Sequence, residues 1–365
     1  MPEMPPLPAL PTILDASLAN PPRSKTPPPV TVLLPVKNAA ATLPSALESL
    51  RSQTLSDFEI VAVDDGSDDD GATWDVLAAT ARRDPRLRPV RLAHGGIAAA
   101  LNAGLSLARG TFLARMDADD WSAPHRLERQ AAFLDTHPDV GLVSCRVAFG
   151  GDRQAARGYL EHVRWANGVC TPEALRLAVF RESPLPHPSV MFRAALPQRY
   201  GAYRQGDFPE DYELWLRWLE GGVVMAKLPE TLLTWNDPPE RLSRVDPRYA
   251  AEAFHRIKAA YLARYLAEHN PFHPDVIVAG AGRVTRRRAG HLLEHGIRIT
   301  AWLDVDPRKV HKVIDGRPVL ALEDVPPPET CCVLPAVASR GATDMLTAFL
   351  EARGFVLGRT YLPMA

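Results

Sequence analysis

The chain has 365 residues, of which 46% are hydrophobic, and a formal net charge of −1. One hydrophobic core serves a chain of this length poorly, so two folded domains are expected. The balanced charge excludes the basic surface that nucleic-acid-binding proteins carry.

No apolar stretch is long enough to cross a bilayer, and Met1 is not followed by a basic and then apolar signal peptide. The four cysteines form no C-x-x-C pair, which favours reduced thiols. A cytoplasmic location is therefore expected, with peripheral contact at the inner face of the membrane left open.

The first 29 residues are rich in proline and lack periodicity, which predicts a disordered tail over 1–29. From Val30 onward, short apolar runs that predict strands alternate with amphipathic segments that predict helices. Strands are expected at 30–34, 59–63, 88–92 and 111–115, with helices at 42–51, 73–82 and 97–108. This alternation predicts a parallel sheet covered on both faces, with ligands at the carboxyl ends of its strands.

A mixed pattern follows, and then a second α/β series begins at Val276. Further elements are expected at 124–136 (helix), 141–147 (strand), 211–220 (helix), 248–268 (helix), 276–279 (strand), 285–295 (helix), 298–303 (strand), 332–334 (strand) and 342–353 (helix). The chain is thus predicted to be an α/β protein with a larger α/β domain over 30–245, a helical connector over 246–272 and a smaller Rossmann-like domain over 273–365.

Acidic side chains follow two of the predicted strands. Asp64 and Asp65 end one strand, and Asp117 and Asp119 follow another in a D-x-D pattern. Two carboxylates so spaced can ligate one Mn²⁺ or Mg²⁺, which would neutralise charge on a departing diphosphate. For Asp64 and Asp65, a solvated turn with helix-capping acids is the alternative.

A third acidic pair, Glu210 and Asp211, opens a predicted helix. Acids at this position stabilise a helix dipole and cap its first turn. Asp211 could equally act as a general base toward an acceptor hydroxyl. The residues by themselves leave the two interpretations even.

Six segments together resemble the family 2 glycosyltransferases in order and approximate spacing, over about residues 30–244. They are 32–38 (Val-Leu-Leu-Pro-Val-Lys-Asn), 63–67 (Val-Asp-Asp-Gly-Ser), 102–104 (Asn-Ala-Gly), 108–110 (Ala-Arg-Gly), 116–120 (Met-Asp-Ala-Asp-Asp) and 209–211 (Pro-Glu-Asp). The resemblance implies a doubly wound GT-A sheet and inverting transfer from a nucleoside-diphosphate sugar, with a UDP-sugar favoured. The implied acceptor is a saccharide or lipid-linked saccharide in bacterial surface polysaccharide synthesis.

The resemblance also implies a role for each matching position. The donor side would comprise Pro35, Val36, Asp64, Asp65 and Asn102. Asp117 would contact the ribose or the metal, and Asp119 would ligate the metal. Asp211 would be the base, with Glu210 supporting it.

One departure concerns Leu101, where many relatives carry an arginine before the asparagine. Arg115 is expected to supply the missing positive charge to the donor. His187 and Ser189 resemble a segment on the acceptor side, although a structural histidine is equally compatible with the sequence. Arg241 lies where relatives close a loop over the diphosphate, with a plain surface arginine as the alternative.

In the C-terminal series, Gly280 and Gly282 follow a strand and open a helix, and Asp304 ends the next strand. This pattern is typical of a nucleotide-binding loop, but Thr285 occupies the third glycine position. A second nucleotide site and a structural or oligomerisation module both remain open. Two other functions are weighed against transfer: sugar-nucleotide binding without turnover, and a nucleotide-dependent oxidoreductase acting through the C-terminal domain.

Overall fold

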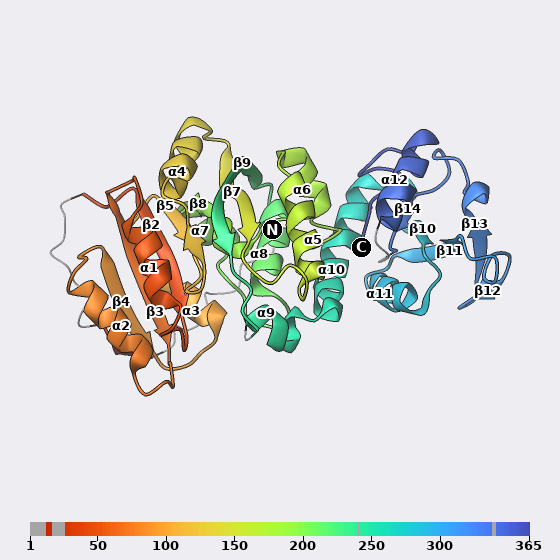
Figure 1. The fold of residues 1–365 in the computed structure, drawn as a ribbon. Helices are drawn as coiled ribbons and strands as arrows, with labels where there is room; N and C mark the ends of the chain where they lie inside the picture. The colour runs from red at the N-terminus through yellow and green to blue at the C-terminus, as the bar shows by residue number, and fades with distance from the viewer. Residues whose placement is uncertain (1–11, 17–25, 240, 338–340) are drawn as a thin grey trace. The chain divides into compact units, whose positions relative to one another are not determined.

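The computed structural model describes residues 12–16, 26–239, 241–337 and 341–365. These residues form two compact units, each described separately below (Figure 1). The first unit holds the described residues of Met1–Leu175, Pro184–Gly206 and Gly221–Arg244. The second holds those of Arg176–Ser183, Asp207–Glu220 and Val245–Ala365.

The first unit is built on a mixed sheet of nine strands in the order β1-β4-β3-β2-β5-β8-β7-β9-β6. Its strands are β1 (Ile13–Asp15), β2 (Val30–Val36), β3 (Phe58–Asp65), β4 (Leu87–Leu92), β5 (Phe112–Arg115), β6 (Trp121–Ser122), β7 (Val140–Phe149), β8 (Met191–Arg193) and β9 (Val224–Trp235). Strands β4, β3, β2 and β5 run parallel. Their carboxyl ends therefore share one edge, as the sequence predicts.

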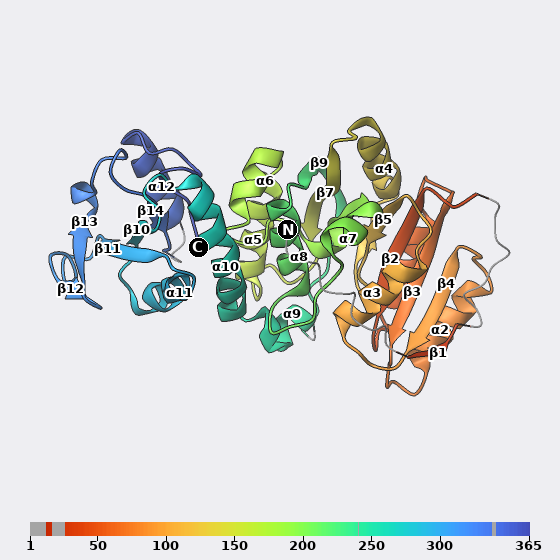
Figure 2. The same ribbon diagram turned by 180° about the vertical axis from the view of Figure 1, so that it is seen from behind.

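Helices cover both faces of this parallel part (Figures 1 and 2). They include α1 (Leu43–Arg51), α2 (Ala72–Ala81) and α3 (Ile97–Leu107), whereas α4 (Arg126–Thr136) and α5 (Arg157–Gly168) pack against β7. Alternate residues of a strand face opposite sides of a sheet, so β3 serves two cores. Ile60 packs in the cluster that includes Leu47 of α1, and Val61 packs in the cluster that includes Ala103 of α3.

The sequence did not predict β9, the longest strand of this sheet. It pairs in parallel with β7, and the register shifts near Cys145 and Arg146. Lys227 interrupts the apolar pattern but is buried, because its ammonium donates to the carbonyl of Pro184 (2.7 Å) and also to that of Ala166. The hydrogen bonds compensate for the buried charge, which periodicity cannot anticipate.

The second unit contains a five-stranded sheet in the order β12-β13-β11-β10-β14. Its elements are α8 (Glu210–Glu220), η2 (Pro247–Tyr249), α10 (Ala251–His269), β10 (Asp275–Ala279), α11 (Arg283–Leu293), β11 (Arg298–Asp304), β12 (Val313–Ile314), β13 (Arg317–Ala321), β14 (Val333–Pro335) and α12 (Ala342–Ala352). All pairs are parallel except β12 with β13. The predicted α/β class and second, smaller sheet are confirmed.

One expectation is wrong within residues 12–16, which were assigned to a disordered tail. Here Ile13–Asp15 forms β1 and pairs antiparallel with β4, because the edge of β4 offers unpaired backbone groups to a short apolar segment. Residues 1–11 and 17–25 of that predicted tail lie outside the described residues. Among the helices that the structure describes, none is both long enough and apolar enough to cross a membrane.

Candidate functional site

Three carboxylates gather in the loop that follows β5. One oxygen each from Asp117, Asp119 and Asp120 lies within 4.8 Å of the others. Asn236, just after β9, holds this loop: its backbone N–H donates to Asp120 Oδ1 (2.8 Å), and its side-chain amide donates to the Asp119 carbonyl (2.7 Å). The parallel strand β5 thus delivers the cluster, and the end of β9 fixes it.

Burial and mutual repulsion make the negative charges of this cluster unfavourable unless a cation lies nearby. Burial and the neighbouring carboxylate of Asp117 raise the pKa of Asp119 to about 6. Burial and the carboxylates of Asp117 and Asp119 raise the pKa of Asp120 well above its usual range. The Oδ2 atom of Asp120 has no hydrogen-bond partner. Arg115, 2% exposed, pairs with Asp117. An unpaired buried oxygen among three carboxylates fits one hard divalent ion such as Mn²⁺ or Mg²⁺.

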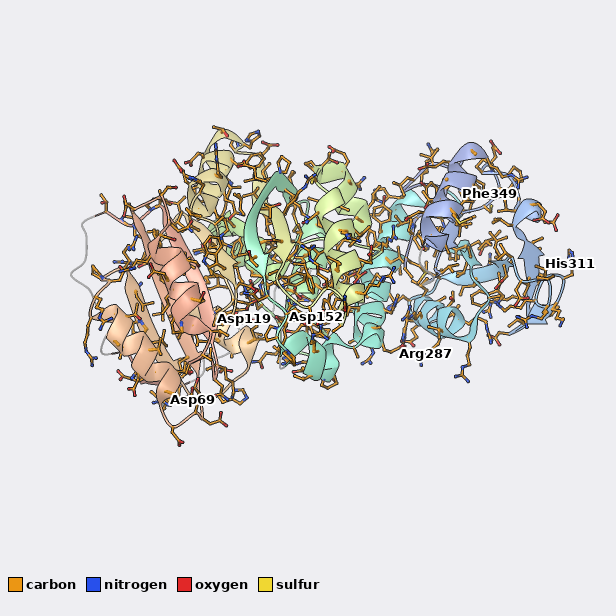
Figure 3. All side chains as sticks on the ribbon, in the orientation of Figure 1. Asp69, Asp119, Asp152, Arg287, His311 and Phe349 are labelled. Atoms are coloured by element: carbon orange, nitrogen blue, oxygen red, sulfur yellow. The ribbon has the colours of Figure 1, made fainter. Side chains whose placement is uncertain are left out.

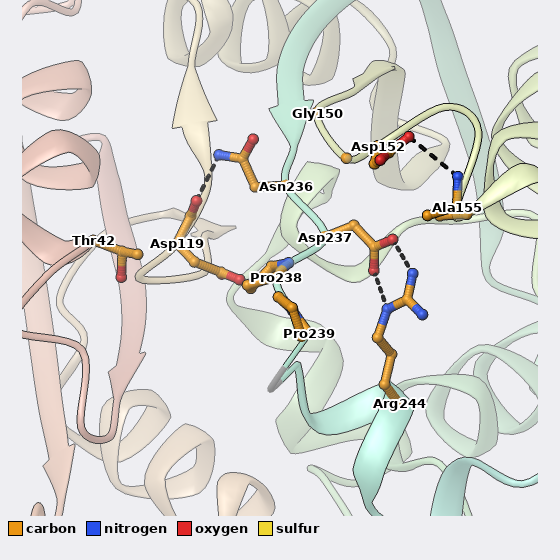
Figure 4. Close-up of a pocket in the computed structure, with 12 residues that line it drawn as sticks. Thr42, Asp119, Gly150, Asp152, Ala155, Asn236, Asp237, Pro238, Pro239 and Arg244 are labelled. Atoms are coloured by element: carbon orange, nitrogen blue, oxygen red, sulfur yellow. Dashed lines mark hydrogen bonds and ion pairs between the residues drawn. The ribbon is translucent and has the colours of Figure 1, made fainter.

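A cavity of about 520 Å³ opens beside this cluster (Figure 4). It is lined by Thr42, Asp119, Gly150, Gly151, Asp152, Ala155, Ala156, Asn236, Asp237, Pro238, Pro239 and Arg244. Asp119, in the loop after β5, and Asp152, after β7, both line the cavity, and Figure 3 labels both. A cavity of this size is typical of sites for nucleotide-sized ligands.

The Glycosyl transferase family 2 model matches residues 31–196. The amylovoran biosynthesis glycosyltransferase AmsE of Erwinia amylovora is 33% identical over 201 residues, which cover 54% of this chain and 71% of AmsE. The chain belongs to glycosyltransferase family 2. The putative glycosyltransferase EpsE of Bacillus subtilis is 30% identical over 229 residues, covering 62% of this chain and 79% of EpsE.

The fold of this family 2 glycosyltransferase also resembles a solved structure. Residues 1–349 of S. aureus TarS, crystallised with UDP-GlcNAc, match with a TM-score of 0.51 and 20% identity. The match covers 64% of this chain and 66% of that one. At this level of identity the likeness concerns the fold, and it agrees with the GT-A type of sheet that the sequence predicts.

On the predicted donor side of the transferase, Asp64 and Asp65 are buried at the end of β3. Asp64 is in register with Val36 of β2, and the preceding Val63 is in register with Pro35. Asp64 Oδ1 accepts hydrogen bonds from the backbone and hydroxyl of Ser67 (2.9 and 2.6 Å). Asp65 instead accepts the backbone N–H groups that precede α3. Asp65 therefore holds the turn that leads into α3, and donor contact remains a prediction for all four positions.

Two further predicted residues form one buried network. The amide of Asn102 bonds the backbone of Tyr203 in both directions (2.9 and 3.1 Å), and the Tyr203 hydroxyl lies 2.9 Å from His187 Nε2. Burial and the charge of Arg115 lower the pKa of His187 well below its usual range, so the ring is neutral. In this transferase, Asn102 thus holds the backbone of the segment that carries Tyr203 in place.

Ser189 is fully buried in the same region. Its hydroxyl donates to the Pro186 carbonyl (2.6 Å) and lies 2.6 Å from the Ser144 hydroxyl. These bonds hold the turn η1 (His187–Ser189) rather than reach solvent. Arg115 is likewise too buried to present its charge at the surface, and its pairing with Asp117 places that charge inside the acidic cluster.

The segment after β9 holds the predicted loop residue Arg241. Its guanidinium lies 4.1 Å from the ring centroid of Trp235 and 3.9 Å from Asp237, whose side chain is fully buried. Arg244 pairs with the same carboxylate and lines the cavity. Asn236, Asp237 and Arg244 were not among the predicted site residues, although the polar pair Asn236 and Asp237 directly after an apolar run was a usable signal.

In the second unit, Glu210 and Asp211 form the first turn of α8, as predicted. Glu210 is 2% exposed, and the Tyr249 hydroxyl donates to its Oε2 (2.6 Å). Asp211 is partly exposed and accepts the backbone N–H of Tyr212 (2.7 Å). Catalysis by Asp211 remains a prediction.

The polar groups of the predicted second nucleotide loop bond to residues of the same domain. Gly280 has φ = +116°, and a side chain there would meet Thr285 at 3.1 Å. Asp304 Oδ2 accepts the Ala281 backbone N–H (2.9 Å) and the Lys309 ammonium (3.0 Å). The acid expected to meet a ribose is therefore already paired, and Gly282 remains the N-cap of α11.

Proposed function

We propose that this transferase moves a sugar, with inversion, from a nucleoside-diphosphate sugar to a saccharide or lipid-linked saccharide of the bacterial surface. Three carboxylates beside a cavity of about 520 Å³ carry this proposal. A UDP-sugar is the favoured donor. Membership of a transferase family favours turnover over simple sugar-nucleotide binding, and over oxidoreduction through the C-terminal domain.

Asp117, Asp119 and Asp120 would hold Mn²⁺ or Mg²⁺, which supplies positive charge next to a departing diphosphate. Asn236 keeps the cluster in place through its hydrogen bonds to Asp119 and Asp120. On the nucleobase and ribose side we assign Pro35, Val36, Asp64 and Asp65. Arg241 and Arg244 would face the diphosphate, because Arg244 lines the cavity and Arg241 lies next to it on the same turn.

For the chemical step, we assign Asp211 as general base, with Glu210 supporting it. The acceptor hydroxyl gives its proton to Asp211 as its oxygen bonds to the anomeric carbon. The bond from that carbon to the diphosphate breaks at the same time, and the nucleoside diphosphate leaves. His187 lies on the proposed acceptor side, where its neutral ring can accept or donate a hydrogen bond.

A thermal-shift screen tests the donor site. UDP-, GDP- and dTDP-sugars are added with and without Mn²⁺ to the intact protein and to Asp119→Asn. A ligand at about 100 times its dissociation constant adds roughly 2.7 kcal/mol of stability. Stabilisation that needs both Mn²⁺ and Asp119 is expected. Equal stabilisation of the variant, or none by any nucleotide sugar, contradicts the proposal.

A further inference from the structure

Hydroxyl groups from the segment after the predicted catalytic domain hold helix α8. Tyr249, the last residue of η2, donates to Glu210 Oε2 (2.6 Å). Tyr261, in the middle of α10, donates to Glu213 Oε1 (2.8 Å). Both acceptors lie in the first turn of α8, where Asp211 also lies. Two bonds therefore flank the candidate base along the helix.

These acceptors are buried carboxylates that need donors. Glu210 is 2% exposed and Glu213 is 1% exposed, and Glu213 also pairs with Arg217 at 2.9 Å. A buried carboxylate that loses a hydrogen-bond donor bears a desolvation penalty, whereas a charge-assisted bond is stronger than a neutral one. The hydrogen bonds to Glu210 and Glu213 therefore stabilise the position of the first turn of α8.

The hydroxyl of Tyr249 remains a donor at neutral pH. Burial and the negative charges of Glu210 and Asp211 raise its pKa. The charge of Asp211 contributes to this shift, so Tyr249 lies within the electrostatic reach of the candidate base as well as in contact with its neighbour.

Packing adds to the same restraint. The ring of Tyr212 lies 5.1 Å from that of Phe254 on α10, and its hydroxyl bonds the Val179 carbonyl (2.5 Å). Trp215 and Trp218 are fully buried on the following turns of α8. With its apolar side packed and its acidic side bonded, α8 has one rotation about its axis, and that rotation sets the direction of Asp211.

We propose that Tyr249 and Tyr261 are positioning residues for sugar transfer, which fix α8, and with it Asp211, through Glu210 and Glu213. The inference rests on the proposed role of Asp211 as general base. On this proposal, η2 and α10 contribute to catalysis indirectly, because the hydroxyls that orient the base come from them.

The experiment uses the full chain with Mn²⁺ and the nucleotide sugar that gives the largest shift in the screen above. Release of nucleoside diphosphate with water as acceptor is followed for Tyr249→Phe, Tyr261→Phe and Asp211→Asn. Tyr265→Phe is the matched control, since this tyrosine also lies on α10 but donates to the Gly358 carbonyl (3.0 Å). Each of the first two variants is expected to lose about tenfold in kcat with donor KM unchanged.

A double variant tests whether Tyr249 acts through Glu210. If it does, Tyr249→Phe combined with Glu210→Gln loses no more activity than Glu210→Gln alone. Wild-type kcat in both tyrosine variants, with Asp211→Asn inactive, overturns the positioning proposal and leaves the base in place. An equal loss in Tyr265→Phe, or a rise in donor KM, overturns it too. Full activity in Asp211→Asn overturns the proposed base itself.

Discussion

Two guanidinium groups lie buried next to the acidic cluster. Arg115 pairs with Asp117, whereas Arg126 donates to the Arg115 carbonyl (3.2 Å) and to the Pro188 carbonyl. Among the described residues, no carboxylate forms an ion pair with Arg126. Burial lowers the pKa of Arg126 to about 10, which still leaves it charged at neutral pH. Both charges therefore offset part of the repulsion among the carboxylates.

Arg115→Met is expected to destabilise the metal-free protein by about 3 kcal/mol, since it leaves a buried cluster of carboxylates without its nearest cation. Added Mn²⁺ should recover part of that loss, because the ion replaces the missing charge. Chemical denaturation with and without Mn²⁺ measures both effects. The explanation fails if Mn²⁺ stabilises the variant no more than the wild type.

Arg51→Met is the matched control for Arg115→Met. Arg51 pairs with Glu48 on α1, and both side chains are more than half exposed. Exposed pairs of this kind contribute little, so the control should leave the stability nearly unchanged with or without Mn²⁺.

His255 makes the second unit sensitive to acid. Burial and the charges of Lys258 and Arg288 lower the pKa of this histidine to about 2. Between that value and about 6.5, the unfolded chain binds a proton that the folded chain does not, so stability falls as pH falls. His255→Gln should remove about 1 kcal/mol per pH unit from the slope between pH 6 and pH 5.

Denaturation of wild type and His255→Gln across this pH range measures the slope. His125→Gln is the control, because the His125 side chain is 63% exposed. A slope that is the same in His255→Gln as in wild type would contradict the assignment.

At the scale of elements, β7 and β9 end side by side, and the residues that follow them line the cavity. Gly150 follows β7, and its backbone N–H donates to the Trp235 carbonyl (2.9 Å). A β-carbon at Gly150 would lie 2.1 Å from Asn236 Oδ1. The close approach of these two strand ends therefore requires a glycine at position 150. The same approach fixes the position of the Asn236 side chain, which holds Asp119.

Gly150→Ala should displace Asn236 and break its hydrogen bond to the Asp119 carbonyl. We expect weaker binding of Mn²⁺ and nucleotide sugar, by about tenfold or more, read from ligand-dependent thermal shifts. Gly158→Ala on α5 is the control, since nothing lies within 4 Å of a β-carbon there and alanine favours a helix. Unchanged ligand shifts in Gly150→Ala would argue against the role of Asn236.

At the scale of the whole molecule, the chain enters the second unit three times. It does so at Arg176–Ser183, at Asp207–Glu220 and finally at Val245–Ala365. No single cut in the chain separates the two units. The helix with the candidate base, α8, packs against α10 and belongs to the unit that contains the second sheet.

A fragment that ends at residue 245, the predicted boundary of the catalytic domain, should therefore be unstable. It lacks Tyr249 and Tyr261, so the buried Glu210 and Glu213 lose donors, and α8 loses its packing partner α10. We expect a lower Tm and no donor turnover compared with the full chain. A fragment 26–245 with the Tm and activity of the full protein would restore the simpler boundary.

The amino-acid sequence by itself determined the elements and the chemistry carried by local patterns. Alternating apolar runs and amphipathic segments predicted the parallel strands β2 to β5 with their helices, because periodicity reports which face of an element is buried. The runs around Asp117 and Glu210 identified the family, since their spacing reflects the ends of particular strands and helices. The Gly280 loop likewise predicted the start of a second parallel sheet.

Only the tertiary structure decided which polar groups meet. Asn236, which follows β9, bonds the Asp119 carbonyl from more than a hundred residues away in the sequence. Strand β9 itself was not predicted because Lys227, buried against two carbonyls, interrupts its apolar pattern. Arg115, expected to supply positive charge to the donor, pairs with Asp117. Such pairings depend on which strand ends and helices lie together in space, whereas sequence periodicity records only whether each residue faces the core.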